Sequence, residues 1–206
     1  DAPPSPPPMP MVPTCVIEME LVMVLDASGS MWPYQQELRE LARSVHQQFE
    51  LSPSWTRVGV VTFAGSAQVA APLTSVRLDV DYAIDAYQPG GGTAISEGMT
   101  KAKNMLLAPG IRGSALRVIL LLTDGVQSTA YGGDREAIEK GIEARVATQA
   151  LTIAVGFGGA ASATLNSIAT PPASMYSYRG NTVADIRARL ADMCTLVSSP
   201  SLPEPP

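Results

Sequence analysis

Short aliphatic runs alternate along the chain with stretches of helical periodicity. The runs that are typical of strands cover residues 18–25, 57–63, 67–73, 117–123, 151–157 and 175–178. Apolar residues recur at helical spacing in 34–49, 77–87, 94–107, 134–147, 162–169 and 183–197. Strands that alternate with helices favour right-handed crossovers and a mostly parallel sheet with helices on both faces. We therefore expect a three-layer, doubly wound α/β fold.

One pair of strands departs from this alternation. Only Ala64, Gly65 and Ser66 separate the runs 57–63 and 67–73. A connection this short joins antiparallel neighbours, because a parallel pair needs a much longer crossover. The third strand of the sheet is therefore expected to be antiparallel to the second.

The prolines mark the ends of the folded unit. Of the 18 prolines, seven lie in residues 1–14 and four in 200–206. Proline fixes φ and removes a backbone donor, so these ends favour extended polyproline II rather than helix or central strand. We expect a proline-rich linker at 1–14, one folded domain at 15–198 and a second linker at 199–206.

Charge and hydropathy exclude two classes of partner. The net charge is −5, and the mean hydropathy is +0.12. An acidic chain repels nucleic acid and offers no basic stripe to an anionic membrane. Its longest aliphatic runs are far shorter than the roughly 20 residues that span a bilayer. We therefore expect no nucleic-acid partner and no direct insertion into a membrane.

Both cysteines lie at the limits of the folded unit. Cys15 stands at its first residues and Cys194 near its last helix. A bond between them would join the two ends of the domain, and such a bond persists only in an oxidising compartment. Two unpaired, half-buried thiols are the alternative. The lone His46, beside Val45 near the edge of an amphipathic helix, is expected to be a surface or boundary residue.

Oxygen-bearing side chains follow several of the predicted strands. Asp26, Ser28 and Ser30 come after the first strand, Thr93 stands in a glycine-rich loop, and Asp124 follows the strand 117–123. In doubly wound sheets, ligands bind beyond the carboxyl ends of the strands. Two carboxylates and three hydroxyls suit a hard divalent cation, most naturally Mg2+, with Ca2+ and Mn2+ as alternatives. These donors leave a coordination position open to an outside carboxylate.

These motifs resemble the metal-ion-dependent adhesion site (MIDAS) of von Willebrand factor type A domains, a family that includes the integrin inserted domains. The resemblance covers about residues 17–196 and implies the strand order 3-2-1-4-5-6. It implies that Ser28, Ser30 and Thr93 contact Mg2+ directly, while Asp26 and Asp124 act largely through water.

The same resemblance implies a switch in which the last helix slides as the metal shell rearranges. Cys194 is predicted to lie in that helix. A bond to Cys15 should therefore restrict the sliding and hold the domain nearly fixed in one state.

Aromatic residues are expected to surround the candidate metal site. Trp32, Pro33 and Tyr34 directly follow Ser30, and Tyr131 follows the third motif. They are interpreted as a contact rim for a partner, with packing at the start of the first helix as the alternative. No G-x-S-x-G motif surrounds a nucleophilic serine and no Walker loop is present, so we expect no enzymatic activity.

The sequence thus favours a protein-binding module that reaches an Asp or Glu of its partner through Mg2+. The proline-rich ends resemble hydroxyproline-rich extracellular glycoproteins, which implies an extracellular, cell-surface or cell-wall location and a matrix or wall glycoprotein as a partner. One alternative is a structural bead in a matrix assembly, in which the metal only stabilises loops. The other is an intracellular scaffold in a multiprotein complex.

Overall fold

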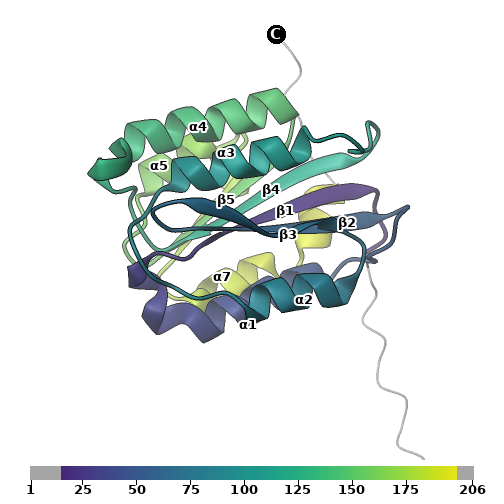
Figure 1. Cartoon of the computed structure of the whole chain (residues 1–206), viewed down its shortest axis with the longest axis horizontal. Helices are drawn as coiled ribbons and strands as arrows, with labels where there is room; N and C mark the ends of the chain where they lie inside the picture. The colour runs from purple at the N-terminus through teal and green to yellow at the C-terminus, as the bar shows by residue number, and fades with distance from the viewer. Residues whose placement is uncertain (1–14, 199–206) are drawn as a thin grey trace, which may run out of the picture.

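The computed structural model describes residues 15–198, which form a six-stranded sheet between two layers of helices (Figure 1). The strand order is β3-β2-β1-β4-β5-β6, and every neighbouring pair is parallel except β2 and β3. This confirms the predicted order and the antiparallel third strand. The two predicted proline-rich linkers lie outside the described residues.

All strands except the antiparallel β3 bring their carboxyl ends to one edge of the sheet. Their bounds are β1 (Met19–Asp26), β2 (Thr56–Phe63), β3 (Ala67–Thr74), β4 (Leu116–Thr123), β5 (Leu151–Phe157) and β6 (Ser177–Gly180). Leu25 near the end of β1 pairs with Thr62 of β2 on one side and Leu122 of β4 on the other. This register places the residues that follow β1 and β4 next to each other.

The helices divide between the two faces of the sheet. Figure 1 shows α3 (Ile95–Leu106), α4 (Gly133–Thr148) and α5 (Ser162–Ile168) on one face, and α1 (Gln35–His46), α2 (Arg77–Asp85) and α7 (Val183–Leu190) on the other. The shorter helical segments are η1 (Gly29–Tyr34), η2 (Thr129–Tyr131), α6 (Ala173–Tyr176) and α8 (Met193–Ser198). No helix within residues 15–198 is both long and apolar enough to cross a membrane.

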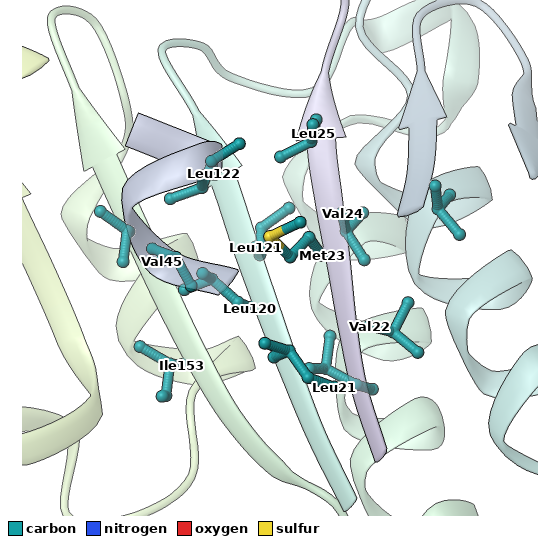
Figure 2. Close-up of a cluster of buried hydrophobic side chains, with 14 of the residues drawn as sticks. Leu21, Val22, Met23, Val24, Leu25, Val45, Leu120, Leu121, Leu122 and Ile153 are labelled. Atoms are coloured by element: carbon teal, nitrogen blue, oxygen red, sulfur yellow. The ribbon is translucent and has the colours of Figure 1, made fainter. Parts of the chain in front are cut away.

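The central strands are buried on both faces. Figure 2 shows Leu21 to Leu25 of β1 and Leu120 to Leu122 of β4, with Val45 of α1 and Ile153 of β5 also in the cluster. All eight residues of β1 are buried. Parallel strands covered by helices on both sides show such continuous apolar runs rather than alternation. Each fully buried aliphatic side chain contributes about 1.5–3 kcal/mol, so this cluster anchors the strands that carry the candidate site.

The last strand and the last helix differ from their predicted bounds. The predicted strand 175–178 begins later, at Ser177, because a helical turn, α6, precedes it. Four residues of mixed apolar pattern do not distinguish a turn of helix from a strand. The predicted helix 183–197 is divided into α7 and α8. At the division, the side chain of Gln48 donates to the Leu190 carbonyl and accepts from the Met193 amide, at 2.7 and 2.9 Å.

The first helix is shorter than predicted, and the expectation for its histidine is wrong. A 3-10 turn, η1, replaces the start of the predicted helix 34–49, and α1 ends at His46. His46 is fully buried. Its Nε2 lies 3.0 Å from Asp81 Oδ1, and its Nδ1 lies 3.2 Å from a guanidinium nitrogen of Arg77. Both partners belong to α2, which packs beside α1, and this burial lowers the pKa of His46.

A disulfide joins the two ends of the described chain. Cys15 and Cys194 are bonded, with their Cα atoms 5.7 Å apart. Of the two arrangements that the sequence left open, the structure therefore contains the bridge rather than two free thiols. Cys15 also pairs with Phe49 through an isolated β-bridge, so the bond lies at the amino end of β1, away from the candidate site.

A buried acidic residue stabilises the same amino-terminal edge of the sheet. The Glu20 side chain on β1 is fully buried. Its Oε2 accepts from Arg57 Nε at 2.9 Å, and its Oε1 accepts from Arg112 Nε at 2.8 Å. Burial alone would raise the pKa of Glu20, but the hydrogen bonds and charges of these two arginines hold it below its ordinary value.

Replacing Glu20 with glutamine should lower the free energy of unfolding by about 3 kcal/mol at pH 7, because both arginines lose a buried anionic partner. The pKa of Glu20 is lower in the folded protein than in the unfolded chain, so the stabilisation by ionised Glu20 is fully present at pH values above its pKa in the unfolded chain. This stabilisation is lost as the pH falls through the pKa of Glu20 in the folded protein. In urea unfolding, the difference in stability between the two proteins should therefore shrink as the pH falls below the pKa of Glu20 in the unfolded chain. Glu139→Gln, an exposed change on α4, is the control, and equal stability of all three proteins at pH 7 would contradict the prediction.

Candidate functional site

Three loops meet at the carboxyl edge of the sheet. They follow β1, precede α3 and follow β4, and backbone hydrogen bonds join them. The amide of Gly29 donates to the Gly91 carbonyl at 3.0 Å, and the amide of Ser128 donates to the Thr93 carbonyl at 2.9 Å. Gly91 has φ +84°, a left-handed conformation that glycine adopts without strain. The middle loop is therefore fixed between the other two.

Hydrogen bonds connect four of the five predicted ligands. Oδ1 of Asp26 accepts from the Ser28 amide at 2.8 Å, a local turn that aspartate favours. The hydroxyls of Ser28 and Ser30 lie 3.1 Å apart. The Ser30 hydroxyl then donates to Asp124 Oδ1 at 2.9 Å, across 94 residues of sequence. The structure thus brings together the side chains that the sequence places at two separate strand ends.

Thr93, the fifth predicted ligand, lies beside the same cluster. Thr93 is buried, and its amide donates to Ser128 Oγ at 3.2 Å. A Cβ placed on Gly125 would be 3.8 Å from the Thr93 hydroxyl oxygen. The Thr93 side chain therefore lies close to the backbone of Gly125, the residue that follows Asp124.

The two carboxylates carry negative charge without a basic partner among the described residues. Asp26 is fully buried and Asp124 largely so. Burial raises the pKa of Asp26 to about 6, although hydrogen bonds from Ser28 and Thr123 oppose the shift. Burial likewise raises the pKa of Asp124. A buried carboxylate is costly unless a cation compensates it, so the cluster is chemically suited to a divalent metal ion.

The composition of the cluster also defines what kind of ion fits. Within residues 15–198, no three His, Cys, Asp or Glu side chains gather closely enough to hold an ion by themselves. Three of the five predicted ligand side chains are hydroxyls, which are weak, uncharged ligands. Such a set fits a hard cation that completes its shell with water or a carboxylate from outside.

Sequence reasoning missed three residues that shape the site. The hydroxyl of Thr123 donates to Oδ2 of Asp26 at 2.5 Å. Ser128 holds the Thr93 amide, as described above, and the Tyr87 hydroxyl donates to the Asp26 carbonyl. Thr123 stands directly before Asp124, so its place at a strand end was a usable signal. Ser128 and Tyr87 are brought to the site only by the tertiary fold.

The predicted aromatic rim divides into exposed and packed residues. The Trp32 side chain is 62% exposed, and Pro33 is exposed as well. Tyr34 packs edge-to-face against Phe157, with ring centroids 5.4 Å apart. Tyr131 lies against Gly92, where an added Cβ would come within 2.8 Å of its ring. The indole of Trp32 is therefore the large apolar surface that the rim offers to a partner.

Comparison with known proteins finds one matching family model and two partial relatives. The family model described as von Willebrand factor type A domain matches residues 20–190. The human collagen alpha-1(XX) chain is 27% identical over 163 residues, which are 76% of this chain and 12% of that protein. Mouse integrin alpha-11 is 28% identical over 120 residues, or 56% of this chain and 10% of that protein. The chain thus spans about a tenth of the length of these relatives.

Solved structures show the same fold. A proximal thread matrix protein from the mussel byssus, described as having a zinc-occupied MIDAS motif, superposes with a TM-score of 0.75 at 25% identity. That match covers 90% of this chain and 47% of the other. Manganese-loaded TRAP protein from Plasmodium vivax superposes with a TM-score of 0.70 at 16% identity, covering 86% of this chain and 73% of the other.

Proposed function

The chain belongs to the von Willebrand factor type A domain family, and from this premise we propose that it is a non-enzymatic protein-binding module whose ligand contact depends on a divalent cation. The observation that carries the proposal is the pair of buried carboxylates, Asp26 and Asp124, that lack a basic partner within residues 15–198 and adjoin serine and threonine hydroxyls. The zinc-occupied motif described for the byssus protein supports a metal at this place.

In this proposal the protein holds the ion with hydroxyls and water. Ser28, Ser30 and Thr93 contact it directly, and Asp26 and Asp124 hold it largely through water molecules. When bound, Mg2+ supplies an open coordination position to a carboxylate oxygen of the partner, and Ca2+ or Mn2+ can take its place. The protein contributes only two negative charges, so the ion stays attractive to an incoming anion.

The partner in this proposal is a protein that presents an exposed Asp or Glu. The Trp32 indole, together with Pro33, Tyr34 and Tyr131, adds contact area around the ion, and aromatic residues of this kind are enriched in protein interfaces. Relatives named as a collagen, an integrin and a byssus matrix protein support a matrix or wall glycoprotein as partner. A net charge of −5 gives no support to nucleic acid.

The proposed location is extracellular, at a cell surface or in a cell wall. The Cys15–Cys194 bond supports this, because disulfides persist in oxidising compartments and are rare in the cytosol. The proline-rich ends, which resemble hydroxyproline-rich glycoproteins, agree with it. The same bond counts against the intracellular scaffold.

A structural bead in a matrix assembly is the second candidate. The likeness to a byssus thread matrix protein favours it, as does the disulfide that joins the two ends of the domain. In that case the ion stabilises the loops and no partner carboxylate reaches it. The two candidates agree that metal stabilises the fold and disagree on whether an acidic ligand binds.

Metal removal should separate these functions. At a Mg2+ concentration 100 times its Kd, binding adds about 2.7 kcal/mol of stability, which should raise Tm by about 5 °C or more relative to EDTA. The peptide Ac-Gly-Asp-Gly-NH2 should then perturb the NMR signals of the Ser28 and Gly29 amides in Mg2+ but not in EDTA. Ac-Gly-Asn-Gly-NH2 is the matched control. Peptide binding that persists in EDTA would refute the metal-dependent function, and stabilisation by Mg2+ without peptide binding would favour the structural bead.

A further inference from the structure

A cavity of about 590 Å3 opens beside the candidate metal site. Its lining residues come from the β2–β3 hairpin, the end of α2 and the loops beside them. Helix α2 packs on both strands of the hairpin, on the face of the sheet that also carries α1 and α7 (Figure 1). Ala27 and Gly90 form part of its lining. Ala27 stands between Asp26 and Ser28, and its carbonyl accepts from the Gly90 amide at 2.8 Å. The cavity and the candidate metal site therefore share a wall of backbone.

The lining of this cavity, which we call the hairpin pocket, contains no charged side chain. Its polar members are hydroxyls and carboxamides, and four of them are Thr62, Ser66, Gln68 and Gln88. The remainder is mostly small and apolar, with several alanines. A charged group that entered would lose its hydration without gaining an opposite charge, so the pocket selects against ions. A neutral group with hydrogen-bonding atoms would find donors and acceptors in the wall.

Thr62 supplies an independent sign that a ligand belongs here. Its side chain on β2 is only 6% exposed, and its hydroxyl has no hydrogen-bond partner among the described residues. Buried hydroxyls are nearly always paired, and an unpaired one destabilises the fold. Rotation about χ1 moves the threonine hydroxyl among three staggered positions, so it can turn toward an entering group and donate this bond. Thr62 is one of the residues that line the cavity beside Ala27 and Gly90.

We propose that the hairpin pocket binds a carboxamide side chain, asparagine or glutamine, of the same protein partner whose carboxylate reaches the metal. This proposal rests on the proposed function. A carboxamide is neutral, donates and accepts together, and can bond both the Thr62 hydroxyl and the amides of Gln68 or Gln88. The shared backbone wall at Ala27 and Gly90 places this group and the carboxylate close together on the partner.

Propionamide in EDTA tests the pocket without any metal. Its NMR titration should shift the amides of Ser66 and Gln68 with a Kd near 10 mM, about what five heavy atoms can supply. Acetate and methylammonium at the same concentrations should leave those amides unchanged. Thr62→Val should weaken propionamide about fivefold, the effect of one neutral hydrogen bond, and Thr62→Ser, which keeps the hydroxyl, should restore most of the affinity.

The matched control is Thr152→Val. Thr152 on β5 is a second buried threonine whose hydroxyl lacks a partner in the described residues, and it does not line the pocket. Both valine variants should raise Tm by about 2–4 °C, because each removes an unpaired buried hydroxyl. Only Thr62→Val should weaken propionamide. The assignment would be overturned if both variants bound propionamide equally well, or if propionamide caused no saturable shifts. It would also be overturned if methyl glucoside, a neutral ligand that offers hydroxyls in place of a carboxamide, caused larger shifts than propionamide.

A second titration tests the link to the metal site. In Mg2+, Ac-Gly-Asp-Gln-NH2 should bind about fivefold more tightly than Ac-Gly-Asp-Leu-NH2, and Thr62→Val should remove the difference. Equal affinity of the two peptides for the unaltered protein would overturn the claim that one partner fills both sites. Because the propionamide titration contains no metal, it separates a failure of the pocket from a failure of the metal-dependent function.

Discussion

Replacing Asp26 with asparagine should weaken the binding of Mg2+ about 10- to 100-fold while leaving the domain folded. Asparagine has nearly the shape of aspartate, and its oxygen can still accept from the Ser28 amide. The Thr123 hydroxyl, which now donates to the carboxylate, can instead accept from the new amide group. What the substitution removes is one of the two negative charges at the candidate site, and the affinity of such sites depends on their charge.

Calorimetric titration with MgCl2 would measure this change. Glu139→Gln alters the net charge by the same amount on the exposed surface of α4, where Glu139 pairs with Arg135. This control should bind Mg2+ like the unaltered protein, and both variants should retain cooperative thermal unfolding. If Asp26→Asn binds Mg2+ as tightly as the control does, Asp26 does not serve a cation and the metal site has to be placed elsewhere.

The fold was predictable because its main signals are local. Continuous aliphatic runs mark buried parallel strands, and a three-residue connection forces the antiparallel pairing of β2 with β3. The errors lie where short segments depend on distant contacts. Gln48, placed after α1, satisfies the backbone at the division between α7 and α8. His46 is buried because α2, more than thirty residues further along the chain, supplies Asp81 and covers it.

The candidate site was predictable for a related reason. Parallel strands end at one edge, so residues after β1 and β4 had to meet, as the Ser30–Asp124 hydrogen bond shows. The residues that hydrogen-bond to this cluster were harder to predict from the sequence, because they come from other elements. Tyr87, just beyond α2, bonds the Asp26 carbonyl, and no spacing in the sequence connects the two. The Thr62 hydroxyl was equally hidden, since only the packed structure shows that it lacks a partner.

Removing the disulfide should produce the largest loss of stability. The bond closes a loop with a sequence separation of 179 residues. In the chain-entropy model, such a closure contributes about 5 kcal/mol by restricting the unfolded chain, and observed values are often smaller. We expect Cys15→Ser combined with Cys194→Ser to lower the free energy of unfolding by about 3–5 kcal/mol and Tm by about 10 °C. Urea and thermal unfolding of the double serine variant and of the unaltered, disulfide-bonded protein would measure the difference.

The double serine variant also tests whether the bond restrains α7. Cys194 lies in α8, beyond the division after Leu190, so the restraint must act through the short connection and the Gln48 bonds. Gln48→Ala, which removes those bonds but keeps the disulfide, is the matched variant. If the Cys15–Cys194 disulfide limits sliding of α7, the double serine variant should differ from the unaltered protein in its Mg2+-dependent affinity for Ac-Gly-Asp-Gly-NH2 as well as in its stability. An unchanged affinity beside a lowered Tm would show that the disulfide stabilises the fold without restraining the helix.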